Sequence, residues 1–143
     1  MDVEITGAGQ KDFAYIQEKI KKYLLDATNL EMGQFYVAKA GGKVAAFGRI
    51  IDFGEFFEIA SLGVDYYQRK RGFGKQILTF LVQEAGRRDI QKPIYGVTHV
   101  PEFVLTCGFV PVESGFPDYL DYKRKHLCHL HESRIKVVKW QGF

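Results

Sequence analysis

The sequence predicts a mixed α/β domain with a mostly antiparallel sheet, and three observations support that fold class. First, the apolar runs 35–40, 43–53 and 56–64 follow one another closely, which is typical of an antiparallel meander. Second, the helix-like segment 74–88 lies between the runs 56–64 and 93–98, which favours a parallel pair of strands on either side of that helix. Third, a length of 143 residues suffices for one domain with its own core.

The first half of the chain carries the clearest local signals. A short strand is expected at 3–5. Residues 11–25 place apolar side chains close to a 3.6-residue period, which predicts an amphipathic helix. Gly41 and Gly42 separate two strand-like runs and indicate a two-residue hairpin, and Gly54 marks the next turn.

The second half continues with shorter elements. Gly108 follows a short apolar segment at a position typical of a residue just past a helix C-terminus. The patterns predict, in chain order, a helix at 74–88, a strand at 93–98, a helix at 100–107, a strand at 109–112, a helix at 119–130 and a last strand at 135–140.

Composition excludes several classes of protein. Apolar content is 46%, normal for a globular chain, and the net charge of +3 does not imply dedicated nucleic-acid binding. No apolar stretch reaches membrane-spanning length, and the acidic start at 1–4 lacks the apolar segment of a signal peptide. Cys107 and Cys128 cannot form a disulfide framework, so a reduced cytoplasmic setting is expected.

The basic segment 68–75 is the strongest functional signal. It reads Gln-Arg-Lys-Arg-Gly-Phe-Gly-Lys and lies between a strand-like run and a helix. Backbone N–H groups at a helix start, together with the helix dipole, bind phosphate groups, and glycines allow close approach. The segment lacks the spacing of a Walker A loop, and Ile77 occupies the third glycine position of a dinucleotide fingerprint. A solvated turn or a general polyanion patch is the alternative.

In three segments, the chain resembles the GNAT acetyltransferase superfamily. The loop matches its Arg/Gln-x-x-Gly-x-Gly/Ala signature at 69–74, Val64 precedes it at the usual interval, and 103–110 is similar to the late helix followed by Gly-Phe. The resemblance covers about 3–112 and implies one N-acetyltransferase domain over 1–143, with 113–143 as a C-terminal extension. It also implies helices on both faces of the sheet and a splayed parallel pair of strands near the cofactor.

A weaker resemblance connects residues 57–64 to the acetyltransferase domain of N-acetylglutamate synthases. The GNAT resemblance itself implies acetyl-CoA as co-substrate, with no metal. Backbone groups of 62–64 would pair with the pantetheine arm, and N–H groups of 70–75 would hold the pyrophosphate. Gly63 inside a strand also indicates a bulge or a close backbone approach. The cofactor-binding residues expected are Leu62, Gly63, Val64, Arg69, Lys70, Arg71, Gly72, Phe73, Gly74 and Lys75.

The reaction needs a proton acceptor for the amine and a donor for the developing negative charge. The resemblance places a base at Glu58, although a solvent-facing strand residue is the alternative. By strand alternation, Glu58 is expected to share a face with Leu62 and Val64. Thr98 and His99 end the strand 93–98, where open sheets place their sites. His99 suits acid or base work, but an ordinary loop histidine is an equally good interpretation.

Two further features bear on chemistry. Many GNAT members carry a tyrosine in the late helix that protonates the leaving thiolate, but the matching residue here is Val104, so the proton donor is left open. The second feature is a group of potential metal ligands whose spacing fits no established zinc pattern, which favours a solvated terminal helix. That group is His126, Cys128, His129 and His131.

The expected function is therefore an acetyl-CoA-dependent N-acetyltransferase that acts on a primary amine of a small molecule, such as an amino acid. Neither a nucleic acid nor a membrane is an expected partner, and a homodimer is left open. Acetylation of proteins or peptides is one alternative. A non-catalytic acyl-CoA-binding regulatory module is a second, and polyanion binding through the basic clusters is a third.

Overall fold

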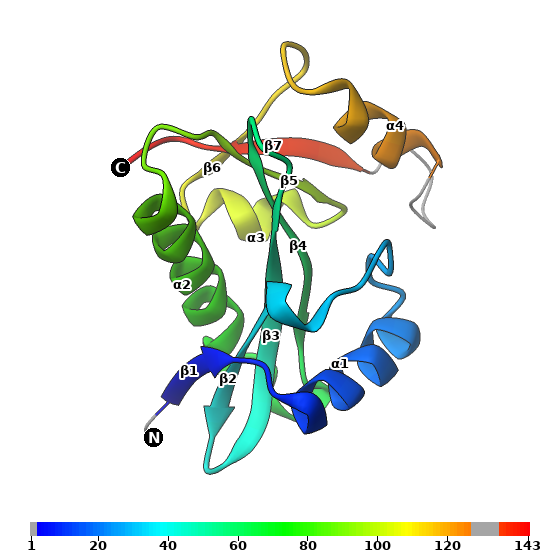
Figure 1. Ribbon diagram of the computed structural model, residues 1–143, viewed down its shortest axis with the longest axis vertical. Helices are drawn as coiled ribbons and strands as arrows, with labels where there is room; N and C mark the ends of the chain where they lie inside the picture. The colour runs from blue at the N-terminus through cyan, green and yellow to red at the C-terminus, as the bar shows by residue number, and fades with distance from the viewer. Residues whose placement is uncertain (1–2, 127–134) are drawn as a thin grey trace.

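The computed structural model describes residues 3–126 and 135–143 (Figure 1). In these residues the strands form one mixed sheet in the order β1-β2-β3-β4-β5-β7-β6. The strands are β1 (Val3–Gly7), β2 (Phe35–Ala40), β3 (Lys43–Asp52), β4 (Phe57–Val64), β5 (Ile94–Thr98), β6 (Phe109–Pro111) and β7 (Lys136–Trp140). The helices are α1 (Gln10–Tyr23), α2 (Phe73–Arg88), α3 (Pro101–Leu105) and α4 (Asp118–His126), with short 3₁₀ turns η1 (Met32–Gln34) and η2 (Tyr66–Gln68).

The predicted fold class is confirmed. β1 to β4 form an antiparallel meander, and β4 and β5 pair parallel on either side of α2, as expected. Two features were not predicted. Neither η1 nor η2 has a clear sequence signal, and β7 enters the sheet between β5 and β6, antiparallel to both.

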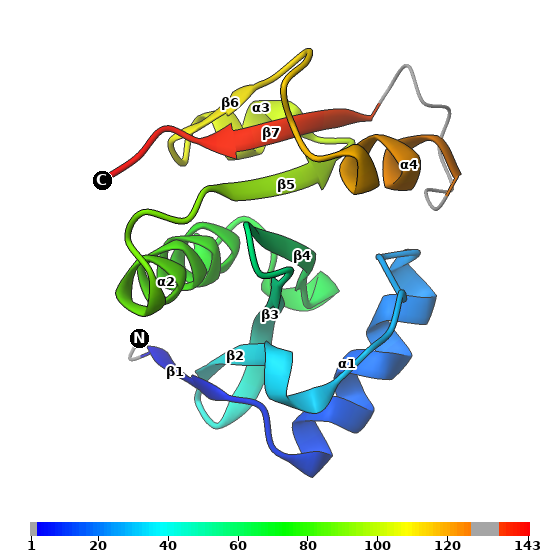
Figure 2. The same ribbon diagram turned by 45° about the horizontal axis from the view of Figure 1, so that its top comes forward.

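Helices cover both faces of the sheet (Figure 2). On one face, α2 packs on β3 and β4 through Ile77, Leu78 and Leu81, and Val104 of α3 joins the same cluster. On the other face, α1 packs through Ile16 and Ile20 onto aromatic and aliphatic residues of β2 and β3. Leu120 of α4 is fully buried against side chains of β5 and β7. Because each of these helices buries one face in a cluster, its apolar residues recur at a helical period in the sequence.

β4 and β5 are paired at only two positions before they separate. Phe57 pairs with Ile94 and Glu58 with Tyr95, and the parallel ladder ends there. β3 accompanies β4 on its other side to Val64. Residues 59–64 therefore have no partner strand on the β5 side, and the two strands diverge (Figure 1).

A β-bulge lies within β4. Ala60 pairs with Arg49 and Gly63 with Phe47, so that Ser61 and Leu62 both stand opposite Gly48. The extra residue shifts the alternation by one position. The expectation that Glu58 shares a face with Leu62 and Val64 is therefore wrong, because both pack in the α2-side cluster that also contains Phe57 and Ile59.

Candidate active site

A cleft with a volume of about 300 Å³ lies between β4 and β5. Its walls come from four regions that are far apart in the sequence. They are the β4 residues 59–62, the β5 end with Gly96, Val97, Thr98 and His99, the segment 23–26 after α1, and Phe103, Val104 and Lys123 from the C-terminal part of the chain. The cleft thus joins an open strand edge to side chains from α3 and α4.

The basic loop leads from β4 into α2. Lys70 has φ +67° and Gly72 has φ +84°, so two residues of the loop adopt the left-handed conformation. Successive N–H groups in such turns can converge on an anion. α2 begins at Phe73 without a side-chain cap, which leaves its first N–H groups available.

The side chains of the predicted cofactor residues differ in their surroundings. Lys70, Arg71 and Lys75 are exposed, whereas Phe73 is buried in the core beneath α2, so Phe73 can contribute only its N–H group. Gly74 lies where a Cβ atom would come within 3.2 Å of Val64 Cγ2. The start of α2 is therefore packed directly against the end of β4.

Arg69 and Gly63 border the open edge of β4. Arg69 Nε donates a hydrogen bond to the Val64 carbonyl at 3.3 Å, and its guanidinium lies over the rings of Tyr23 and Tyr66. A Cβ atom on Gly63 would lie 2.5 Å from the Phe47 ring, so the close approach is by a side chain rather than by backbone. The bulge that Gly63 indicated lies just before it.

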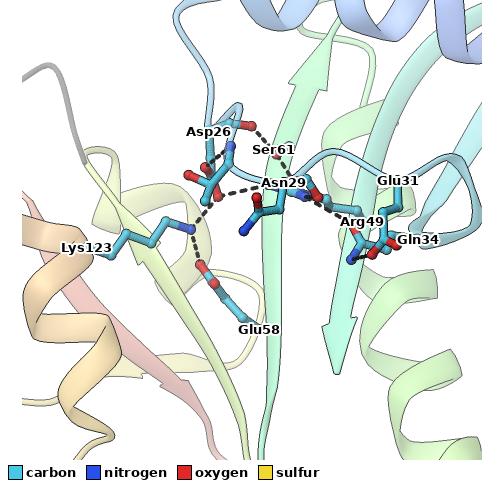
Figure 3. A network of polar contacts seen from close by, with 9 residues as sticks. Asp26, Asn29, Glu31, Gln34, Arg49, Glu58, Ser61 and Lys123 are labelled. Carbon is cyan, nitrogen blue, oxygen red and sulfur yellow. Dashed lines mark hydrogen bonds and ion pairs between the residues drawn. The ribbon is translucent and has the colours of Figure 1, made fainter. Parts of the chain in front are cut away.

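Glu58, the predicted base, is fully buried and does not line the cleft. Its Oε2 accepts a hydrogen bond from Lys123 Nζ, and its Oε1 has no hydrogen-bond partner among the described residues (Figure 3). Burial raises the pKa of the Glu58 carboxyl above its ordinary value, although the neighbouring ammonium of Lys123 opposes that effect.

Lys123 connects Glu58 to Asp26, and no role was predicted from the sequence for Lys123 or for Asp26. Lys123 Nζ lies 2.5 Å from Asp26 Oδ2. Burial alone would lower the pKa of Lys123, but the two carboxylates outweigh it and the pKa is raised. Burial likewise opposes ionisation of Asp26, yet Lys123 lowers the pKa of that carboxyl. Lys123 lies one turn after buried Leu120 on α4, and that spacing was the available signal for its burial.

Arg49 completes a buried charged cluster, which we define as Asp26, Arg49, Glu58 and Lys123. Its side chain is fully buried, and Nη2 lies 3.1 Å from Asp26 Oδ2. Nε donates to Ser61 Oγ at 3.0 Å, and Nη1 donates to Gln34 Oε1 at 2.9 Å (Figure 3). The cluster holds two acidic and two basic groups. A lone arginine within the apolar run 43–53 was the signal that sequence reasoning missed.

Thr98 and His99 do reach the cleft, at the C-terminal end of β5. Thr98 Oγ1 accepts a hydrogen bond from the Val100 amide at 3.0 Å, which fixes the hydroxyl oxygen. His99 is exposed. Val104, at the position of the family tyrosine, is buried and lines the same cleft, so that this wall offers no acid.

The potential metal ligands named from the sequence lie mostly outside the described residues. His126 lies in α4 with its ring centroid 4.7 Å from that of Tyr122, while Cys128, His129 and His131 lie outside the described residues. Within 3–126 and 135–143, no group of three or more His, Cys, Asp or Glu side chains could hold a metal ion. Cys107 is partly buried and packs against the α2-side cluster.

The helices that the structure describes include none that is both long enough and apolar enough to span a membrane.

Comparison with known families identifies most of the chain. The model of the Acetyltransferase (GNAT) family matches residues 8–104, which include the basic loop, β4, β5 and the start of α3.

Solved structures share the fold at low sequence identity. N-acetylglutamate synthase from Neisseria gonorrhoeae, complexed with coenzyme A and N-acetyl-glutamate, matches with a TM-score of 0.79 and 14% identity over 98% of this chain. The chain spans 35% of that protein. Rv2747 from Mycobacterium tuberculosis, in complex with CoA and NLQ, matches with a TM-score of 0.75 and 20% identity, over 96% of this chain and 98% of that one. Escherichia coli ElaA matches with a TM-score of 0.69 and 14% identity, over 98% and 99%.

Proposed function

Because the chain belongs to the GNAT acetyltransferase family, we propose that it transfers the acetyl group of acetyl-CoA to the primary amine of a small molecule such as an amino acid. One observation carries this proposal: the open edge of β4 borders a cleft, the uncapped start of α2 packs against the end of that same strand, and Asp26 and Lys123 of the buried charged cluster line the cleft. The first two fit the donor, and the third fits a small charged acceptor.

The residues present fit CoA. The unpaired edge at 59–64 offers backbone N–H and C=O groups that can pair with the amides of a pantetheine arm, as an added strand would. The N–H groups of 70–75, together with the dipole of α2, suit the pyrophosphate. The exposed side chains of Lys70, Arg71 and Lys75 add attraction for its negative charge. When bound, acetyl-CoA supplies a thioester whose acyl carbon accepts a nucleophile.

The chemistry requires an uncharged amine. Its nitrogen forms a bond to the acyl carbon, the carbon–sulfur bond breaks, and one proton leaves the nitrogen. We assign Glu58 as the proton acceptor, because its raised pKa suits a base and its Oε1 is unpartnered. Since Glu58 lies outside the cleft, the proton reaches it through a water molecule or through Lys123. Thr98 is placed to donate to developing negative charge, and His99 is the second acid–base candidate.

The cleft favours a small acceptor that carries both signs of charge. Asp26 and Lys123 line it, and the buried charged cluster balances two acids with two bases. An amino acid can exchange its ammonium and carboxylate with these internal ion pairs without leaving net charge buried. The Neisseria gonorrhoeae structure contains N-acetyl-glutamate, which is an N-acetylated amino acid, and this supports the choice of an amino acid as acceptor.

Two measurements test the proposal. Acetyl-CoA should raise the melting temperature, since a ligand at 100 times its Kd stabilises the folded state by about 2.7 kcal/mol. A panel of amines and amino acids, read out by the release of free CoA, should then reveal an acceptor. Glu58→Gln should keep the thermal shift and lose about 10²-fold or more in kcat. Glu113→Gln, an exposed carboxyl after β6, is the matched control.

Each alternative has its own result. No thermal shift at millimolar acetyl-CoA would remove the cofactor assignment. Binding without CoA release for any acceptor would favour a non-catalytic acyl-CoA-binding module, and release with peptides alone would favour a protein acetyltransferase.

A further inference from the structure

The bulge in β4 contains a strained residue at the wall of the cleft. Ser61 has φ +55°, a left-handed conformation that costs a residue with a Cβ atom free energy and that glycine adopts readily. Ser61 and Leu62 line the cleft, and the bulge sets the direction of their backbone groups. Such a strained backbone conformation persists only where neighbouring groups hold it in place.

Arg49 is such a group. Its Nε donates to Ser61 Oγ at 3.0 Å, and the Ser61 hydroxyl donates in turn to the Asp26 carbonyl at 2.6 Å. The same guanidinium bonds the Asp26 carboxylate and the carbonyl of Asn29. One buried side chain therefore links the bulge of β4 to the segment that follows α1, and Leu24, Leu25 and Asp26 of that segment also line the cleft (Figure 3).

We infer that Arg49 is a positioning residue that holds Ser61 in its left-handed conformation, and thereby sets the acceptor side of the cleft. Arg49 does not line the cleft, so it acts through Ser61 and Asp26. None of its hydrogen bonds goes to the loop 69–75, which holds the phosphates in our proposal. Its loss should therefore weaken acceptor use more than CoA binding, because the phosphate contacts of that loop remain. The kinetic part of this inference rests on the proposed function.

A rescue experiment tests the inference. Arg49→Met keeps a long apolar stem but removes the hydrogen bonds, so kcat/KM for the acceptor should fall by about 10²-fold, as small displacements of reacting groups do. Adding Ser61→Gly should recover about tenfold, because glycine needs no partner at positive φ. Ser61→Gly alone should lose less acceptor kcat/KM than Arg49→Met, since the strain and the bond that relieves it disappear together. The acetyl-CoA thermal shift should persist in all three variants.

A second readout needs no acceptor. Amide hydrogen exchange in the peptide 60–64 should be faster in Arg49→Met and return toward the wild-type rate in the double variant, while exchange in α2 stays constant. If wild type acetylates nothing, the proposed function fails and this exchange pattern still decides the inference. The inference would be overturned if acceptor kcat/KM survived Arg49→Met. It would also be overturned if adding Ser61→Gly restored neither kcat/KM nor the exchange rate, because a substitution at position 61 would not rescue the loss of a purely structural arginine.

Discussion

Asp26 joins the two cations of the buried charged cluster, since its Oδ2 accepts hydrogen bonds from both Arg49 and Lys123. The pKa of Asp26 is lowered from 3.8. A carboxyl whose pKa is lower in the folded state stabilises the fold at pH values above its ordinary pKa, and that contribution is lost as the pH falls through the folded pKa. One residue thus makes the stability of the cleft wall sensitive to acid.

The Asp26→Asn variant should show this dependence. Near pH 6 we expect it to lower the free energy of unfolding by about 3 kcal/mol, because two buried cations lose their shared partner. The difference from wild type should shrink as the pH falls below 3.8. Urea unfolding between pH 3 and pH 7 measures it, with Glu113→Gln as the control. A difference that stays constant or grows toward acid pH would contradict the assigned direction.

At the scale of elements, the loop before α2 depends on Gly72. A Cβ atom there would have open space around it, so that only the positive φ of +84° opposes a larger residue. Gly41 provides the matched case, because it has φ +60° and open space but lies in the β2–β3 hairpin. Comparing the same substitution at the two positions therefore separates the effect of backbone strain from an effect on the candidate site.

Gly72→Ala and Gly41→Ala should each lower stability by about 1 kcal/mol, the cost of a left-handed residue with a Cβ atom. Gly72→Ala should in addition reduce CoA affinity by about tenfold or more, because relief of the strain moves the N–H groups at the start of α2. Isothermal titration with CoA compares the two. Equal affinity in both variants would show that the backbone of this loop does not bind the cofactor.

The elements were largely predictable, because each has its own signal. Apolar periodicity located α1 and α2, and glycine pairs located the β2–β3 hairpin, to within a few residues. The bulge at Ser61 was not predictable in its register, because it depends on Gly48 in the next strand and on the hydrogen bonds of Arg49. A one-residue shift of this kind reverses which side chains face the cleft, and strand alternation alone cannot detect it.

The candidate site was predictable only where its residues lie in one contiguous segment. The basic loop is a contiguous segment with a recognisable signature, so its residues were named from the sequence. The residues that join Glu58 in the buried charged cluster were not, because Lys123 lies 65 positions away and Asp26, which pairs with Lys123, lies in an irregular segment. Their meeting depends on how α4 and the segment after α1 pack around the sheet, which no local pattern records.

In the whole molecule, Lys123 ties the C-terminal part to the N-terminal meander across the cleft. Its ammonium reaches from α4 to Asp26 and to Glu58 of β4, where the β4–β5 ladder ends. The pair with Glu58 is buried and the pair with Asp26 is partly buried, so losing the cation would leave two carboxylates without it in a poorly solvated place.

Lys123→Met should therefore lower the free energy of unfolding by about 3–5 kcal/mol, and adding Glu58→Gln should recover part of that loss, because it removes one of the unpaired charges. Lys125→Met is the control: its ammonium pairs with Asp121 on the surface of the same helix, and such pairs contribute about 0.5 kcal/mol. Chemical denaturation of the four variants and wild type gives the coupling. Strictly additive losses for Lys123 and Glu58 would argue against the buried pair.

The placement of β7 has a consequence for the order of assembly during synthesis. β7 is made after both of its neighbours, β5 and β6, which have no ladder with each other. The meander of β1 to β4 can form from neighbouring segments as they leave the ribosome, but β6 must wait for residues 136–140 before it can join the sheet. One wall of the cleft is therefore among the last parts to form, and a nascent chain that stalls before β7 would expose the free edges of β5 and β6 to other chains.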